Sequence, residues 1–109
     1  MRNLFSRNIK KLSPDMRGMY LVTTQNSTHI WNLDDMEYTR VPGKKSRNSF
    51  AYDYVPAKIT LIAKWPEVGN VSCIFYDDPY DRSMEQYRIS SKIKSIKKIS
   101  PKKYPGVGK

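Results

Sequence analysis

The sequence predicts a mostly β fold, a small antiparallel barrel or sandwich of about six strands. Short segments rich in β-branched and aromatic residues recur along the chain, and turn signals containing Gly, Pro, Asn or Asp separate them. Aromatic residues make up 12% of the 109 residues, and the eight tyrosines among them favour strands over helices. This length indicates one domain with a modest core.

The longest hairpin is predicted at residues 57–76, where the letters read AKITLIAKW, then PEVGN, then VSCIFY. In the first arm, apolar and polar residues alternate with the period of two of a strand with one buried face. The second arm is apolar on both faces, which is typical of a central strand. The turn between them contains Pro66, Gly69 and Asn70, which favour chain reversal. The face predicted to be buried in the first arm carries Ile59, Leu61, Ala63 and Trp65.

Three shorter strands are predicted to form a meander ahead of this hairpin, over residues 19–25, 28–33 and 36–41. The turns between them are about two residues long, the commonest length in hairpins, and a Pro-Gly pair ends the third strand. Residues 44–56 are then expected to cross the body of the domain. Residues 77–85 are expected to form an acidic loop around Pro79.

The segment QYRISSKIKSIKKIS, residues 86–100, fits two structures. Tyr87, Ile89 and Ile93 keep the phase of a strand, and Ile96 breaks it. As a helix, the four isoleucines would share one face. Because isoleucine and serine are poor helix formers, we favour a strand to about Ile93, a bulge or break, and a continuation to Ile99. A basic amphipathic helix is the alternative.

Charge divides the chain into a basic N-terminal arm (1–18), a β domain (19–100) and a basic tail (101–109). The arm contains a stretch with the spacing of a short helix, and a mobile arm is the alternative. The formal net charge is +10, yet residues 19–85 carry seven basic and nine acidic groups, whereas residues 86–109 carry eight basic groups and no acid. Positive charge that is segregated at the chain ends indicates an anionic partner.

The leading candidate site is the basic end. In an extended chain, Arg88, Lys92, Lys94 and Lys98 would share one face, about 6–7 Å apart, while Ile89, Ile93 and Ile99 face inward. The alternative is a solvated edge strand whose lysines prevent aggregation. The candidate nucleic-acid-binding residues are Tyr87, Arg88, Lys92, Lys94, Lys97, Lys98, Lys102 and Lys103.

A second candidate site is a protein interface, because the tyrosines exceed what a small core can bury. The alternative is cross-strand packing of the tyrosines over a sheet face. The candidate anchors are Trp31, Tyr38, Tyr52, Tyr54 and Tyr80, with Trp65 in addition.

No catalytic, cofactor or metal signature accompanies these sites. His29, the single histidine, lies in a predicted strand without a serine or cysteine nucleophile motif, and Cys73 is expected to be buried. Asp77, Asp78 and Asp81 lack the ligand spacing of a calcium loop, so a polar turn is favoured there. No stretch approaches membrane-spanning length. We therefore expect a non-enzymatic protein with no cofactor, metal or membrane contact, located in a reducing cytoplasm.

The stretch from Tyr20 to Gly43, YLVTTQNSTHIWNLDDMEYTRVPG, resembles the N-terminal half of small β-rich proteins from phages of actinobacteria, and RISSKIKSI resembles their closing strand. The resemblance covers about half of the chain. It implies a phage accessory protein that acts in the host cytoplasm, and no particular activity.

Three functions fit these expectations. The first is a non-enzymatic phage accessory protein that binds nucleic acid or another anionic partner through its basic terminal segments. The second is a protein-interaction module that inhibits or redirects a host factor. The third is a small structural component of the virion. Self-association by strand-edge pairing is compatible with all three.

Overall fold

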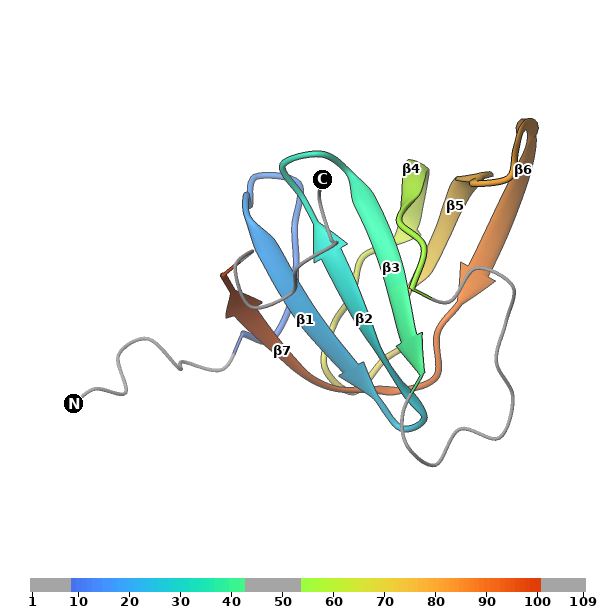
Figure 1. Ribbon diagram of the computed structural model, residues 1–109. Coiled ribbons are helices and arrows are strands. Elements are labelled where there is room, and N and C mark those ends of the chain that lie inside the picture. Colours follow the sequence, from blue (N-terminus) through green and yellow to red (C-terminus); the bar gives the residue numbers. More distant parts are fainter. Residues whose placement is uncertain (1–8, 43–53, 101–109) are drawn as a thin grey trace.

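The computed structural model describes residues 9–42 and 54–100, and these form seven strands and no helix (Figure 1). The mostly β prediction is confirmed. Within these ranges no helix is long and apolar enough to span a membrane. The strands are β1 (Met19–Thr24), β2 (Ser27–Asn32), β3 (Glu37–Pro42), β4 (Ala57–Lys64), β5 (Cys73–Asp78), β6 (Asp81–Ile89) and β7 (Ile93–Ile99).

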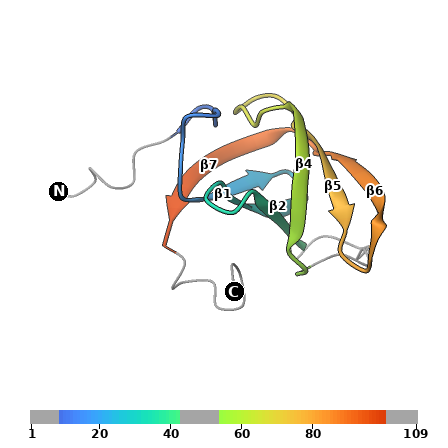
Figure 2. The same cartoon turned by 90° about the horizontal axis from the view of Figure 1, so that it is seen from above.

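The strands form a single antiparallel sheet in the order β6-β5-β4-β3-β2-β1-β7, so the predicted closure into a barrel is wrong. β3 and β4 pair at two positions, Glu37 with Lys58 and Tyr38 with Ala57. The sheet curls, as Figure 2 shows from above. β6 and β7 are its two edges although they are consecutive in the chain, and the short link at residues 90–92 carries the chain from one edge to the other.

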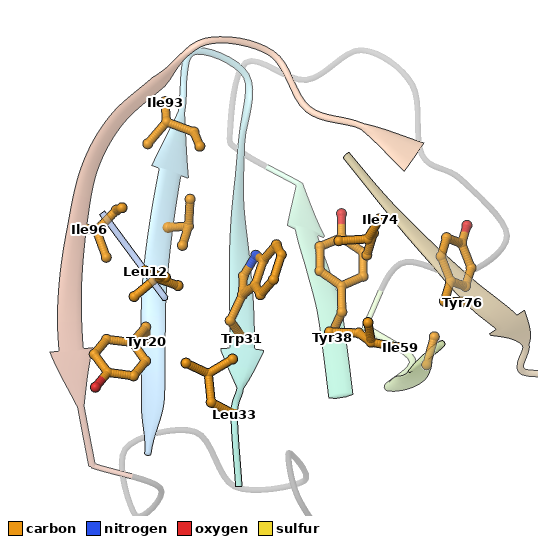
Figure 3. Packing of buried hydrophobic residues seen from close by; sticks show 12 residues of the cluster. Leu12, Tyr20, Trp31, Leu33, Tyr38, Ile59, Ile74, Tyr76, Ile93 and Ile96 are labelled. Carbon is orange, nitrogen blue, oxygen red and sulfur yellow. The ribbon is translucent and has the colours of Figure 1, made fainter. Parts of the chain in front are cut away.

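The hydrophobic core includes side chains from β1 to β5 and from β7 (Figure 3). Trp31 of β2 is fully buried at its centre, edge-on to Tyr38 of β3 with ring centroids 6.0 Å apart. The Trp65 ring lies next to the Trp31 ring, with centroids 6.5 Å apart, and Trp65 is half-buried. The other members of the cluster are Leu12, Tyr20, Val22, Leu33, Ala57, Ile59, Ile74, Tyr76, Ile93 and Ile96.

Residues 9–18, the described part of the predicted N-terminal arm, lie against the sheet. The Ile9 N–H donates to the Ile96 carbonyl at 3.3 Å, and the Leu12 N–H donates to the Pro66 carbonyl at 3.0 Å. Leu12 is fully buried in the core. This segment therefore joins the edge strand β7 to the β4–β5 connection through isolated strand bridges, and the short helix considered for the arm does not extend over these residues.

The predicted hairpin of residues 57–76 is present, but the phase of its first arm changes. The pairing of β4 with β5 shifts between Ile59 and Leu61 and again between Ile62 and Lys64. Each shift inserts one extra residue into β4, and an extra residue moves the following side chains to the other face. Ile59 is therefore buried as predicted, whereas Leu61 is exposed and Ile62 turns toward the core instead.

The C-terminal half of the chain is extended throughout, so the helix alternative for residues 86–100 is wrong. The predicted acidic loop is the tip of a hairpin, because β6 already begins at Asp81. The chain breaks before Ile93, which starts β7, and a register shift opposite Thr23 and Thr24 lets both Ile93 and Ile96 face the core. Ile89, which was predicted to face inward, is exposed.

Leu12 gives a direct test of whether residues 9–18 belong to the domain. Leu12→Ala is expected to lower the free energy of unfolding by about 2–4 kcal/mol, because it leaves a cavity under the sheet. Lys11→Ala, one residue away and exposed, should change it by less than about 0.5 kcal/mol. Urea denaturation of both variants measures the difference. Equal, small effects would show that the segment contributes nothing to the core.

Candidate anion-binding surface

Basic side chains from both ends of the chain gather around β7. Lys92, which precedes the strand, and three lysines within it are exposed. The bridge between Ile9 and Ile96 places Ile9 beside the same strand, and the chain then leads Lys10 and Lys11 to the neighbouring β4–β5 connection, where Lys11 bridges Glu67. We name this group the β7 basic surface: Lys10, Lys11, Lys92, Lys94, Lys97 and Lys98.

The strand register decides where each lysine of β7 points. Lys97 lies opposite Leu21, and Lys98 lies opposite Tyr20, a core residue of β1. Because consecutive residues of a strand point to opposite faces, Lys97 lies on the outer face and Lys98 on the core face, at its rim. Lys94 is the extra residue at the register shift between Thr23 and Thr24 and is exposed.

The prediction that Arg88, Lys92, Lys94 and Lys98 share one face is therefore wrong. Arg88 pairs with Ile74, on the core side of β5, and is half-buried. The break at residues 90–92 and the irregularity in β7 interrupt the alternation that the prediction assumed. The lysines instead surround the strand on more than one side.

Within the described residues, none of the six lysine side chains of the β7 basic surface makes a hydrogen bond or an ion pair. The Lys98 Nζ lies 6.0 Å from the centroid of the Tyr20 ring. Burial, with a smaller effect of the Asp34 charge, raises the pKa of Tyr20, so this phenol stays neutral at physiological pH and does not cancel the Lys98 charge.

The Lys98 side chain packs against the backbone of Gly18. Its φ of +100° lies in the region that favours glycine, and a Cβ there would come within 2.9 Å of the Lys98 Cε. The Gly18 N–H donates to the Asp34 Oδ1 at 3.0 Å, and its carbonyl accepts from the Leu33 N–H at 2.8 Å. The turn before β1 is thereby tied to the end of β2.

The other predicted site residues are divided between core and surface. Trp31 and Tyr38 are 1% and 5% exposed, so they are core residues and not the surface anchors that were predicted. Tyr54, Tyr80 and Tyr87 are exposed. Tyr52, Lys102 and Lys103 lie outside the described residues. Lys10 and Lys11 were not among the predicted site residues. Their charge is evident from the sequence, but the pairing of Ile9 with Ile96, which brings them near β7, could not be predicted from it.

His29 belongs to a buried polar chain. Its Nε2 lies 2.9 Å from the Ser27 Oγ and its Nδ1 lies 2.6 Å from the Tyr38 hydroxyl, with the two rings stacked at 5.4 Å. The Thr24 hydroxyl donates in turn to the Ser27 carbonyl at 3.0 Å. Ser27 and His29 are both buried, so this serine–histidine pair is not accessible to a substrate and links β1, β2 and β3 internally.

The carboxylates of the β5–β6 hairpin organise its turn. Asp78 accepts from the Tyr80 N–H at 2.9 Å and from the Gln86 side chain at 3.2 Å, and Asp81 accepts from the Ser83 hydroxyl at 2.6 Å. Within residues 9–42 and 54–100, no three His, Cys, Asp or Glu side chains are placed to hold a metal ion. A cleft of about 430 Å³ nearby mixes both signs of charge, with Glu37, Lys58, Asp77, Asp78 and Arg82 in its lining.

A scan against protein-family models, a search of curated proteins and a search of solved structures each returned no match. The resemblance to phage proteins therefore stays a prediction.

Gly18 and Gly69 both have a positive φ, but only Gly18 lies against the Lys98 side chain. Replacing each by alanine therefore distinguishes the cost of backbone strain from the cost of a clash with Lys98. Gly69→Ala, at φ +92° with nothing within 4 Å of the new Cβ, should cost about 1 kcal/mol of unfolding free energy from strain alone. Gly18→Ala should cost more, because the Lys98 side chain must also move. In a Lys98→Ala background that extra cost should vanish. Urea denaturation measures all four proteins, and an unchanged Gly18 effect in that background would contradict the contact.

Proposed function

We propose that this protein is a non-enzymatic binding protein that holds nucleic acid on the β7 basic surface. The observation that supports this function most is that the N-terminal segment, which pairs with β7 through Ile9, brings Lys10 and Lys11 near the exposed lysines of that edge strand. Asp77, Asp78, Asp81 and Glu85 lie on the hairpin that ends at the opposite edge.

Lysines bind phosphates as point charges and release the counterions that the phosphates had condensed. Such contacts give affinity and orientation but do not read base sequence. If all six lysines of the β7 basic surface contact phosphates of a duplex, the logarithm of the affinity should fall with the logarithm of the salt concentration with a slope of about −5. Binding should therefore be strong at low salt and weak at high salt.

The protein-interaction alternative is less well supported. Of its five predicted anchors, Trp31 and Tyr38 are core residues, whereas Tyr54 and Tyr80 remain exposed. These two tyrosines give a partner protein little contact area by comparison with the well-packed central pockets in which binding hot spots cluster.

The test compares two double variants that each remove two positive charges. Lys94→Gln with Lys97→Gln should lower the affinity for a fluorescent oligonucleotide about tenfold at low salt and reduce the salt slope by about 2. Lys10→Gln with Lys11→Gln should have a similar effect. The matched control, Lys58→Gln with Arg82→Gln, lies away from β7 and should change both quantities little. Equal losses in all three proteins, or no binding at low salt, would contradict the proposal.

A further inference from the structure

We propose that the nucleic acid is single-stranded and that its bases stack on the outer face of strands β4 to β6. This inference rests on the proposed function and names the form of its partner. The face in question points away from the core and carries Leu61, Cys73, Phe75, Tyr87 and Ile89, which we call the apolar patch.

The apolar patch is continuous across three strands. Leu61 of β4 lies opposite Phe75 of β5, and Phe75 lies opposite Tyr87 of β6, with the two aromatic ring centroids 6.0 Å apart. In the neighbouring row, Cys73, which was predicted to be buried and is half-buried on this outer face, lies opposite Ile89. Leu61, Tyr87 and Ile89 are 57%, 64% and 59% exposed. Folded monomers seldom expose large apolar side chains side by side, and such patches mark binding surfaces.

The apolar patch and the β7 basic surface are successive parts of one chain segment. From Tyr87 and Ile89 the chain turns through residues 90–92 and continues into the exposed Lys92, Lys94 and Lys97. Figure 2 shows β6 and β7 as one curved path along the sheet. Hydrogen bonds fix the turn: the Ser90 N–H donates to the Ser72 carbonyl at 2.9 Å, and the Ile93 N–H donates to the Asn70 carbonyl at 2.8 Å.

The two ends of the apolar patch carry opposite charges. At the end of the patch nearer to β7, the exposed Lys64 lies opposite Cys73. At the other end, Asp77 and Glu85 lie opposite each other, and Glu85 accepts a hydrogen bond from the Thr60 hydroxyl at 2.6 Å. A polyanion that approaches along β7 therefore meets lysines first, then apolar and aromatic side chains, and is repelled beyond Tyr87.

The aromatic part of the path selects a single strand. Bases in a duplex are stacked on each other, so a tyrosine on a sheet face cannot reach them, whereas unpaired bases stack on aromatic rings regardless of sequence. A duplex would use the lysines alone. Ten residue steps from Tyr87 to Lys97 span at most about 33 Å, and the turn at residues 90–92 shortens this path. It therefore accommodates up to about five nucleotides, near the short end of the range for single-strand-binding folds.

The test measures the anisotropy of a fluorescent six-nucleotide single strand and of a twelve-base-pair duplex at low salt. Tyr87→Ala should weaken binding of the single strand by roughly 5- to 150-fold, the range for one lost base stack. It should leave the affinity for the duplex and the salt slope unchanged. Tyr87→Phe should bind normally, and Tyr87→Leu, which keeps an apolar contact with Phe75, should be as weak as Tyr87→Ala. Tyr80→Ala, an exposed tyrosine at the hairpin turn, is the control.

The outcomes separate this inference from the proposed function. If single strand and duplex bind equally and Tyr87→Leu has no effect, the β7 basic surface binds nucleic acid and the apolar patch does not take part. If neither oligonucleotide binds at low salt, both proposals are wrong. If sedimentation shows a dimer of the free protein that Tyr87→Leu dissociates, a second copy of the chain covers the patch, and the inference is overturned.

Discussion

A tight turn at residues 90–92 connects β6 to β7. β6 and β7 are consecutive, yet they form the two edges of the sheet, so the chain must leave one edge and reach the other within residues 90–92. Ser72 and Ser90 hold this turn with two hydrogen bonds, each 2.9 Å long, one between backbone groups and one from the Ser72 N–H to the Ser90 hydroxyl. Beyond it, Ile93 and Ile96 enter the core, and the lysines between and after them are left on the surface.

The same turn separates the charges. The acidic β5–β6 hairpin ends at one edge of the sheet and the lysines of β7 lie at the other, where the N-terminal segment pairs through Ile9 and continues into Lys10 and Lys11. Leu12 anchors that segment in the core, so the position of its lysines is tied to the stability of the domain. Core packing and the candidate site therefore share residues 9–12: their apolar members stabilise the fold, and their basic members face the solvent.

The strands and turns were predictable because alternation, β-branched residues and turn signals are local properties of the sequence. Which side chains of each strand face the core was less predictable. One extra residue in β4 moved Leu61 outward, and another in β7 brought Ile93 and Ile96 to the same side; such insertions leave no mark in an apolar segment. Trp31 and Tyr38 were misassigned because an aromatic residue in a strand suits either face. The basic end was predictable from composition, whereas the contribution of Lys10 and Lys11 required the long-range bridge from Ile9 to Ile96.

Under the proposed function, Lys10 and Lys11 bind the same anion as the lysines of β7. Backbone amide shifts of the ¹⁵N-labelled protein, recorded while a short single strand is added at low salt, test it most directly. We expect shifts at Ile9 to Lys11, at Lys92 to Lys98 and around Tyr87, and none at the turns near Asp35 and Tyr80. Shifts concentrated on the acidic hairpin, or shifts at Lys92 to Lys98 without any at Ile9 to Lys11, would contradict it.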